Sequence, residues 1–170
     1  ILAGCTKTEP IVTPAPTPSS TPLFASDADA LEAATGAYAA YLKVSDQILM
    51  DGGVNPERIA SVATKSWAAI QMASFAKERD RGWRSTGGST FDGLTLQQQE
   101  TTSRMRVPVI TAYVCVDVSA VDVFGRDGVS VVSEDRPDRS PVEVSFELAE
   151  STSKTLLVAD ESSWSGPGVC

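Results

Sequence analysis

The amino-acid sequence predicts an α+β fold in which helices come first and an antiparallel sheet follows. Between residues 26 and 81, apolar side chains recur every three or four positions, which is the spacing of amphipathic helices. After Gly82 the period changes to two, as in strands whose side chains alternate between two faces. Hydrophobic residues make up 42% of the 170-residue chain, which is enough for a core. We expect three N-terminal helices packed on a bent sheet of about four strands.

The first and longest helix is expected between residue 26 and the break at residues 51–53. Ser26 and Asp29 have the spacing of a capping box, and Asp51 is followed by two glycines, which commonly end helices. Apolar or small side chains between these ends fall on one stripe, namely Leu31, Ala34, Tyr38, Leu42, Ser45 and Leu49, widened by Tyr41 and Ile48.

Two further helices are expected before Gly82. Asn55 followed by Pro56 is typical of an N-cap and a first turn, so a short second helix is predicted there. A third helix is predicted over residues 62–81. Its apolar side is expected to hold Trp67, Ile70, Ala73 and Ala76, with Met72 and Phe75 beside them.

The strongest strand signal covers residues 106–124, where both faces are largely apolar, as in a central strand. An earlier strand is predicted over 89–100, with a bulge or bend at Gly93. Residues 141–149 alternate cleanly, and 154–164 form the last expected strand. The connections are then a turn at 125–128, an exposed loop at 133–140 and a turn at 151–153.

The first residues predict lipid attachment. Leu2, Ala3, Gly4 and Cys5 resemble the lipobox of bacterial lipoproteins. The resemblance implies cleavage before Cys5 by the lipoprotein signal peptidase and a diacylglycerol thioether on the cysteine sulfur. Because the chain does not start with methionine, we expect the rest of a signal peptide upstream, with residues 1–4 as its remnant. The alternative is a floppy N-terminus with an incidental cysteine.

Residues 5–24 are expected to form a tether. The stretch 6–22 carries Pro10, Pro14, Pro16, Pro18 and Pro22, and such a run favours extended polyproline II over a helix or a central strand. At about 3.1 Å per residue, some 18 residues would hold the following domain up to ~55 Å from a membrane. We therefore expect one folded domain over 25–170, anchored through Cys5 on the outer, extracytoplasmic face of the cell membrane.

The other two cysteines are expected to pair. Outside the cytoplasm thiols oxidise, and once Cys5 carries lipid, Cys115 and Cys170 remain as an even pair. The alternative is two unpaired cysteines, one buried and one frayed. No CxxC pair is present, so a zinc or thioredoxin-like site has no support.

Charge and histidine content exclude several functions. The formal charge is −8 and lysine and arginine form no cluster, which argues against nucleic-acid binding. The chain has no histidine, so Ser-His and Cys-His dyads and histidine metal sites are excluded. We expect neither a metal nor a cofactor.

The order and lengths of the elements over residues 26–164 resemble the NTF2-like cone, in which a long first helix lies across the concave face of a bent sheet. A narrower resemblance lies in "CVDVS" (115–119) together with the last cysteine of "SSWSGPGVC" (162–170). These motifs are similar to those of a group of uncharacterised actinobacterial NTF2-like lipoproteins. The resemblance implies a Cys115–Cys170 disulfide and gives no activity.

NTF2-like domains often hold a pocket between the helices and the concave sheet. The candidate pocket residues here are Tyr38, Tyr41, Trp67, Trp83, Tyr113 and Asp117. Isomerases and dehydratases of this family use an Asp base with Tyr or His partners, which would make Asp117 a base beside a Tyr donor. In the alternative, Asp117 ends a strand and accepts from backbone amides or Arg side chains at the rim. A disulfide at Cys115 would also fill the space that a substrate needs.

Three functions follow from these expectations. The first is a non-catalytic domain, held off the membrane by its tether, that binds a small apolar ligand or an envelope protein. The second is a structural accessory that forms a homodimer through its convex sheet, as NTF2-like sheets often do. The third is an isomerase- or dehydratase-like enzyme that uses Asp117.

Overall fold

A computed structural model of the chain describes residues 23–99, 108–150 and 153–170, and within these the predicted α+β order holds. Three helices come first: α1 (Asp27–Met50), the 3-10 helix η1 (Pro56–Ser61) and α2 (Lys65–Arg81). Seven strands follow, all of them antiparallel to their neighbours: β1 (Arg84–Thr86), β2 (Thr90–Phe91), β3 (Thr95–Gln99), β4 (Ile110–Asp117), β5 (Asp122–Phe124), β6 (Arg139–Leu148) and β7 (Leu156–Ser163).

Helix α1 begins and ends as the sequence predicts. The Asp29 amide donates to the Ser26 hydroxyl oxygen at 3.2 Å, which satisfies one of the free amides of the first turn. At the other end Gly52 and Gly53 have φ values of 68° and 74°, and the Gly53 amide donates to the Ile48 carbonyl. The buried stripe between these ends holds Ala30, Ala34, Tyr38, Tyr41 and Ile48.

Helix α2 starts three residues later than predicted and buries a different side. Ala63 forms a parallel bridge with Val158, so the chain before α2 runs beside β7 as an extended segment. Thr64 then caps the helix through its hydroxyl oxygen. Ile70, which was expected on the apolar side, is 57% exposed. The buried residues of α2 are Trp67, Ala68 and Phe75.

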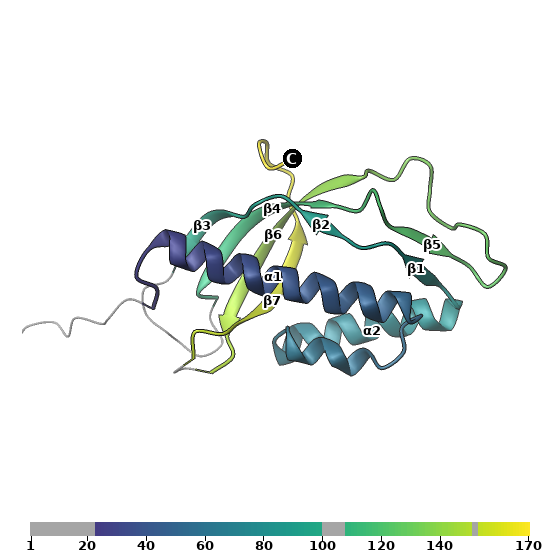
Figure 1. Cartoon of the computed structure of the whole chain (residues 1–170), viewed down its shortest axis with the longest axis horizontal. Coiled ribbons are helices and arrows are strands. Elements are labelled where there is room, and N and C mark those ends of the chain that lie inside the picture. The colour runs from purple at the N-terminus through teal and green to yellow at the C-terminus, as the bar shows by residue number, and fades with distance from the viewer. Residues whose placement is uncertain (1–22, 100–107, 151–152) are drawn as a thin grey trace, which may run out of the picture.

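The strands form two sheets rather than one of about four strands. The larger sheet has the order β2-β4-β6-β7, with β3 also paired to β4, and α1 crosses one face of it (Figure 1). Two predicted strands are each divided: 89–100 becomes β2 and β3 on either side of Gly93, and 106–124 becomes β4 and β5. Strand β5 leaves the large sheet and pairs with β1, a strand that the sequence did not predict, in a two-stranded ribbon.

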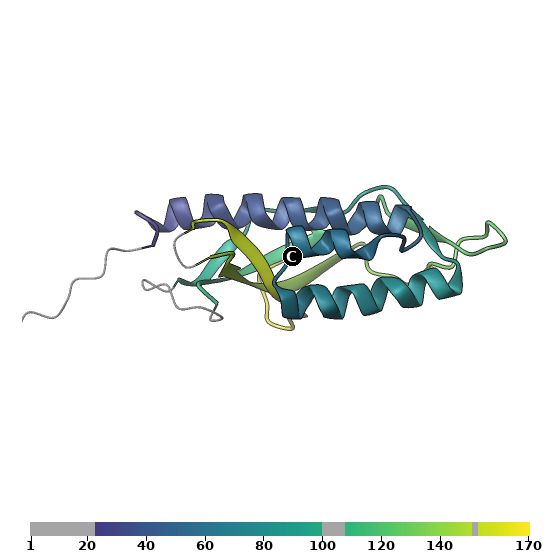
Figure 2. The ribbon, with the colours of Figure 1, turned by 90° about the horizontal axis from the view of Figure 1, so that it is seen from below.

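The helices cover one face of the large sheet, and this face carries the core. Figure 2 shows α1 and α2 side by side with η1 between them. Ile110, Ala112 and Val114 point from β4 toward the helices, and their register partners on β6 are Phe146, Val144 and Val142. A bulge interrupts the next ladder, because Ser145 pairs with Asp160 whereas Phe146 pairs with Val158.

Candidate functional site

Three aromatic residues fill the space between the helices and the large sheet. Tyr38 and Tyr41 of α1 are 0% and 3% exposed, and Trp67 of α2 is buried beside them. The Trp67 indole nitrogen donates to the Tyr41 hydroxyl at 3.1 Å, and the Tyr38 ring meets Phe91 edge-on. Large aromatic side chains thus occupy the interior where the sequence placed a pocket.

A carboxylate that the sequence did not single out lies among these rings. Glu161 of β7 is the register partner of Val144 and so faces the core, where its Oε2 accepts a hydrogen bond from the Tyr38 hydroxyl at 2.9 Å. Burial raises the pKa of Glu161, and the bond from Tyr38 opposes part of that shift. The pKa of Tyr38 is also raised, first by burial and then by the negative charge of Glu161.

Tyr113 and Asp117 lie on the opposite face of the sheet. Their register partners are Glu143 and Arg139, whereas the core-facing residues of β4 pair with valines and Phe146. The Asp117 carboxylate accepts from the Ser119 hydroxyl at 2.6 Å and from the Ser119 amide at 2.9 Å. These bonds lower the pKa of Asp117, so the residue ends the strand as an acceptor. Tyr38 and Asp117 therefore do not share a pocket.

The predicted disulfide joins Cys115 and Cys170, whose Cα atoms are 5.1 Å apart. Trp164 packs on Tyr113 with ring centroids 4.4 Å apart, on the face away from the helices. Gly166 lies so close to Trp164 that a Cβ there would come within 2.4 Å of the indole ring. The C-terminal segment 164–170 is thus held against this outer face of β4.

Trp83, the remaining residue of the predicted pocket, lines a groove of about 370 Å³ between α1, α2 and the β1–β5 ribbon. The Arg81 guanidinium lies over its ring at 4.7 Å from the centroid, and Arg81 also pairs with Glu78 at 3.1 Å. The groove is separate from the buried Tyr38, Tyr41 and Trp67, which are not among the residues that line it.

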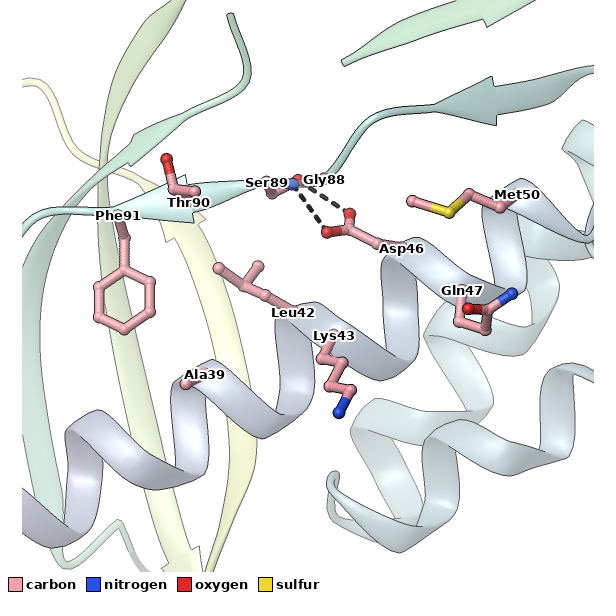
Figure 3. Close-up of a pocket in the computed structure, with 10 residues that line it drawn as sticks. All are labelled: Ala39, Leu42, Lys43, Asp46, Gln47, Met50, Gly88, Ser89, Thr90 and Phe91. Atoms are coloured by element: carbon pink, nitrogen blue, oxygen red, sulfur yellow. Dashed lines mark hydrogen bonds between the residues drawn. The ribbon is translucent and has the colours of Figure 1, made fainter. Parts of the chain in front are cut away.

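A second groove, of about 430 Å³, lies between α1 and the segment 88–91 (Figure 3). Its apolar wall includes Leu42 and Phe91, and the Lys43 side chain extends at its rim. Asp46 links α1 to the segment 88–91, because its carboxylate accepts hydrogen bonds from the Ser89 amide at 2.7 Å and from the Ser89 hydroxyl at 2.9 Å.

No protein-family model, curated protein or solved structure matches this chain. Within the described residues, no group of three or more cysteine, aspartate and glutamate side chains is placed to hold a metal ion. None of the helices in that part of the chain has the length and apolar character needed to cross a bilayer. Cys5 and the predicted tether lie outside the described residues, as does most of the predicted turn at 151–153.

Proposed function

We propose that this chain is a lipid-anchored, extracytoplasmic lipoprotein whose NTF2-like domain binds a ligand or an envelope protein without catalysing a reaction. The anchor is Cys5, the tether is 5–24 and the domain is 25–170. The lipobox and the proline-rich stretch after it support the anchor. The Cys115–Cys170 disulfide supports export, because such bonds persist mainly in oxidising compartments. The position of α1 across one face of the sheet supports the NTF2-like arrangement.

The observation that carries the binding role is the contrast between interior and surface. Tyr38, Tyr41 and Trp67 occupy the interior. Open grooves lie instead on the surface beside α1, lined by apolar side chains with a few polar groups, which is the usual composition of a ligand site. Recognition at these grooves would suit a domain that is held away from the membrane by a tether.

The two alternatives have weaker support. A homodimer through the middle of the outer sheet face would have to displace the segment 164–170, which Cys170 ties to β4. An enzyme that uses Asp117 would need a nearby tyrosine donor and a raised pKa, whereas Asp117 is bonded to Ser119 and its pKa is lowered. The Glu161–Tyr38 pair has the right groups for proton transfer, but Tyr38 is fully buried among packed side chains.

The anchoring is tested by expressing the whole gene with its own signal sequence and separating membrane from soluble protein. We expect the wild-type chain in the membrane fraction, labelled by a palmitate analogue, and Cys5→Ser unlabelled and released. Ser19→Ala in the tether is the control and should behave as wild type. Equal membrane retention of Cys5→Ser would overturn the anchor.

The binding role is tested in the same cells with a photocrosslinking amino acid. At Lys43 or Ser74, each beside one of the two grooves, we expect a discrete crosslinked product. At Ser133, on an exposed loop away from both grooves, we expect none. Absence of products from both groove positions would count against an envelope protein as the partner and leave a small ligand to be tested directly.

A further inference from the structure

One cation at the groove beside Trp83 has no partner of opposite charge. Arg84 of β1 lines this groove, and within the described residues its side chain makes neither an ion pair nor a hydrogen bond. The Arg84 side chain lies against the end of α1, because a Cβ on Gly52 would be 3.2 Å from its Nε. Gly52 is one turn beyond Leu49, which also lines the groove. The guanidinium is therefore placed on the α1 side of the groove.

The carboxylate on which Arg84 acts is already bonded to another arginine. Asp51 Oδ2 accepts a hydrogen bond from Arg58 Nη2 at 2.7 Å. This bond is the first cause that lowers the pKa of Asp51, and the charge of Arg84 adds a smaller effect. Two guanidinium groups thus share one carboxylate, and one positive charge is left without a counterpart.

The single acidic residue that lines the groove does not balance Arg84 either. Glu78 of α2 pairs with Arg81 at 3.1 Å, and the Arg81 guanidinium lies over the Trp83 ring. Arg58, Arg81 and Arg84 together with the carboxylates of Asp51 and Glu78 carry a net charge of +1, whereas the whole chain carries −8. A local excess of positive charge in an acidic protein favours an anionic ligand at this groove.

The rest of the lining is apolar or neutral. Apolar surface comes from Leu49, Phe75, Trp83, Val121 and Val123, and neutral polar groups come from Ser45, Gln71, Ser74 and Ser85. One charged group in a largely apolar lining is typical of sites that fix the orientation of a small ligand. A guanidinium also presents parallel N–H donors that match the two oxygens of a carboxylate.

We propose that the groove between α1, α2 and the β1–β5 ribbon binds a small ring compound that carries one carboxylate, with its ring on the Phe75 and Trp83 wall and its carboxylate on Arg84. The volume of about 370 Å³ lies near the lower end of the range for ligand pockets, which fits a compound of one or two fused rings. This inference rests on the proposed binding role, and it names the class of ligand.

Two probes of matched shape test the ionic contact: 2-naphthoate, and 2-naphthamide, which has a neutral amide in place of the carboxylate. Affinities are measured at pH 7 by amide NMR shifts on the full chain carrying Cys5→Ser, so that it stays out of the membrane. We expect 2-naphthoate to bind about fivefold more tightly at about 0.01 M salt, because Arg84 is exposed and exposed ion pairs are weak. At about 1 M salt the two affinities should be equal, because salt screens the pair.

Substitutions assign the preference to Arg84. Arg84→Met keeps an apolar stem without the charge and should reduce the ratio of the two affinities to about one. Arg84→Lys, which keeps the charge and loses the paired donors, should retain about half of the preference. Lys77→Met removes an exposed cation of α2 that does not line the groove, and it should leave the ratio unchanged. Each ratio compares two probes on one variant, so a loss of stability in that variant does not alter it.

The location is tested by filling the groove from its rim. Ser74 is an exposed residue of α2 that lines the groove, so Ser74→Trp should abolish binding of both probes. Ala73→Trp, at the neighbouring exposed position outside the groove, should keep it. A ratio near one at low salt, no saturable binding of either probe, or a preference that survives Arg84→Met would overturn the proposal. These outcomes do not depend on membrane fractionation or crosslinking, so the ligand class and the proposed function fail separately.

Discussion

Replacing Tyr38 by phenylalanine should destabilise the protein by an amount that depends on the charge of Glu161. The substitution keeps the ring, with its contacts to Tyr41 and Phe91, and removes only the hydroxyl that donates to Glu161 at 2.9 Å. Hydrogen bonds to charged groups contribute about 1.5–3 kcal/mol, and neutral ones about 1 kcal/mol. We therefore expect a loss of about 2 kcal/mol at neutral pH, measured by urea unfolding with tryptophan fluorescence.

A double-mutant cycle separates this pair from general packing effects. Glu161→Gln keeps an acceptor for Tyr38 but cannot ionise, so in that background Tyr38→Phe should cost only about 1 kcal/mol. The coupling energy is then about 1 kcal/mol. Tyr113→Phe is the matched control, because the Tyr113 hydroxyl also meets a carboxylate, that of Glu143, but on the outer face of the sheet. Water screens that interaction, so this substitution should lower the free energy of unfolding much less than Tyr38→Phe.

The pH dependence follows from the raised pKa of Glu161. A carboxyl whose folded pKa lies above its unfolded value of 4.5 favours the fold when protonated, and this contribution is lost as the pH rises through the folded pKa. Glu161→Gln should therefore gain stability relative to wild type between pH 4.5 and 7. The cost of Tyr38→Phe should shrink as the pH falls through the same range. An equal cost at both ends of the range, or zero coupling, would refute the assignment of an ionised Glu161 that accepts from Tyr38 at neutral pH.

Two further predictions concern the disulfide and the hydrogen bonds between Asp46 and Ser89. Reduction of the Cys115–Cys170 bond, which closes a separation of 55 residues, should lower the free energy of unfolding by about 4 kcal/mol, and a Cys170→Ser variant that is as stable as the oxidised chain would contradict this. Asp46→Ala should cost about 2 kcal/mol because two bonds from Ser89 are lost, and Ser89→Ala, which keeps the amide bond, about 1 kcal/mol. Equal losses from these two substitutions would show that the amide bond contributes nothing.

Local sequence determined the bounds of α1 well because the signals that begin and end this helix are themselves local. Ser26 and the glycines after Asp51 bound α1. Of the predicted stripe between them, Ala34, Tyr38, Tyr41 and Ile48 are buried, whereas Leu31, Leu42, Ser45 and Leu49 are only partly buried. The cysteine pairing could also be predicted, because it follows from the number of cysteines left after Cys5 and from the oxidising conditions outside the cytoplasm. That argument does not require knowledge of the fold. For β4, strict alternation correctly placed Tyr113 and Asp117 on one face.

Tertiary structure decided which face of the sheet Tyr113 and Asp117 occupy, and it also decided which carboxylate points toward the core. Alternation along β7 would place Asp160 on the same face as Val158, but the bulge opposite Ser145 and Phe146 shifts the phase and turns Glu161 inward. The separation of β5 from β4 likewise depends on pairing with β1, a three-residue strand too short to show a period. The groove at Ser85 exists only because that ribbon lies beside α1 and α2. Sequence period fixes the relation between near neighbours, whereas bulges and long-range pairings decide which residues meet across the fold.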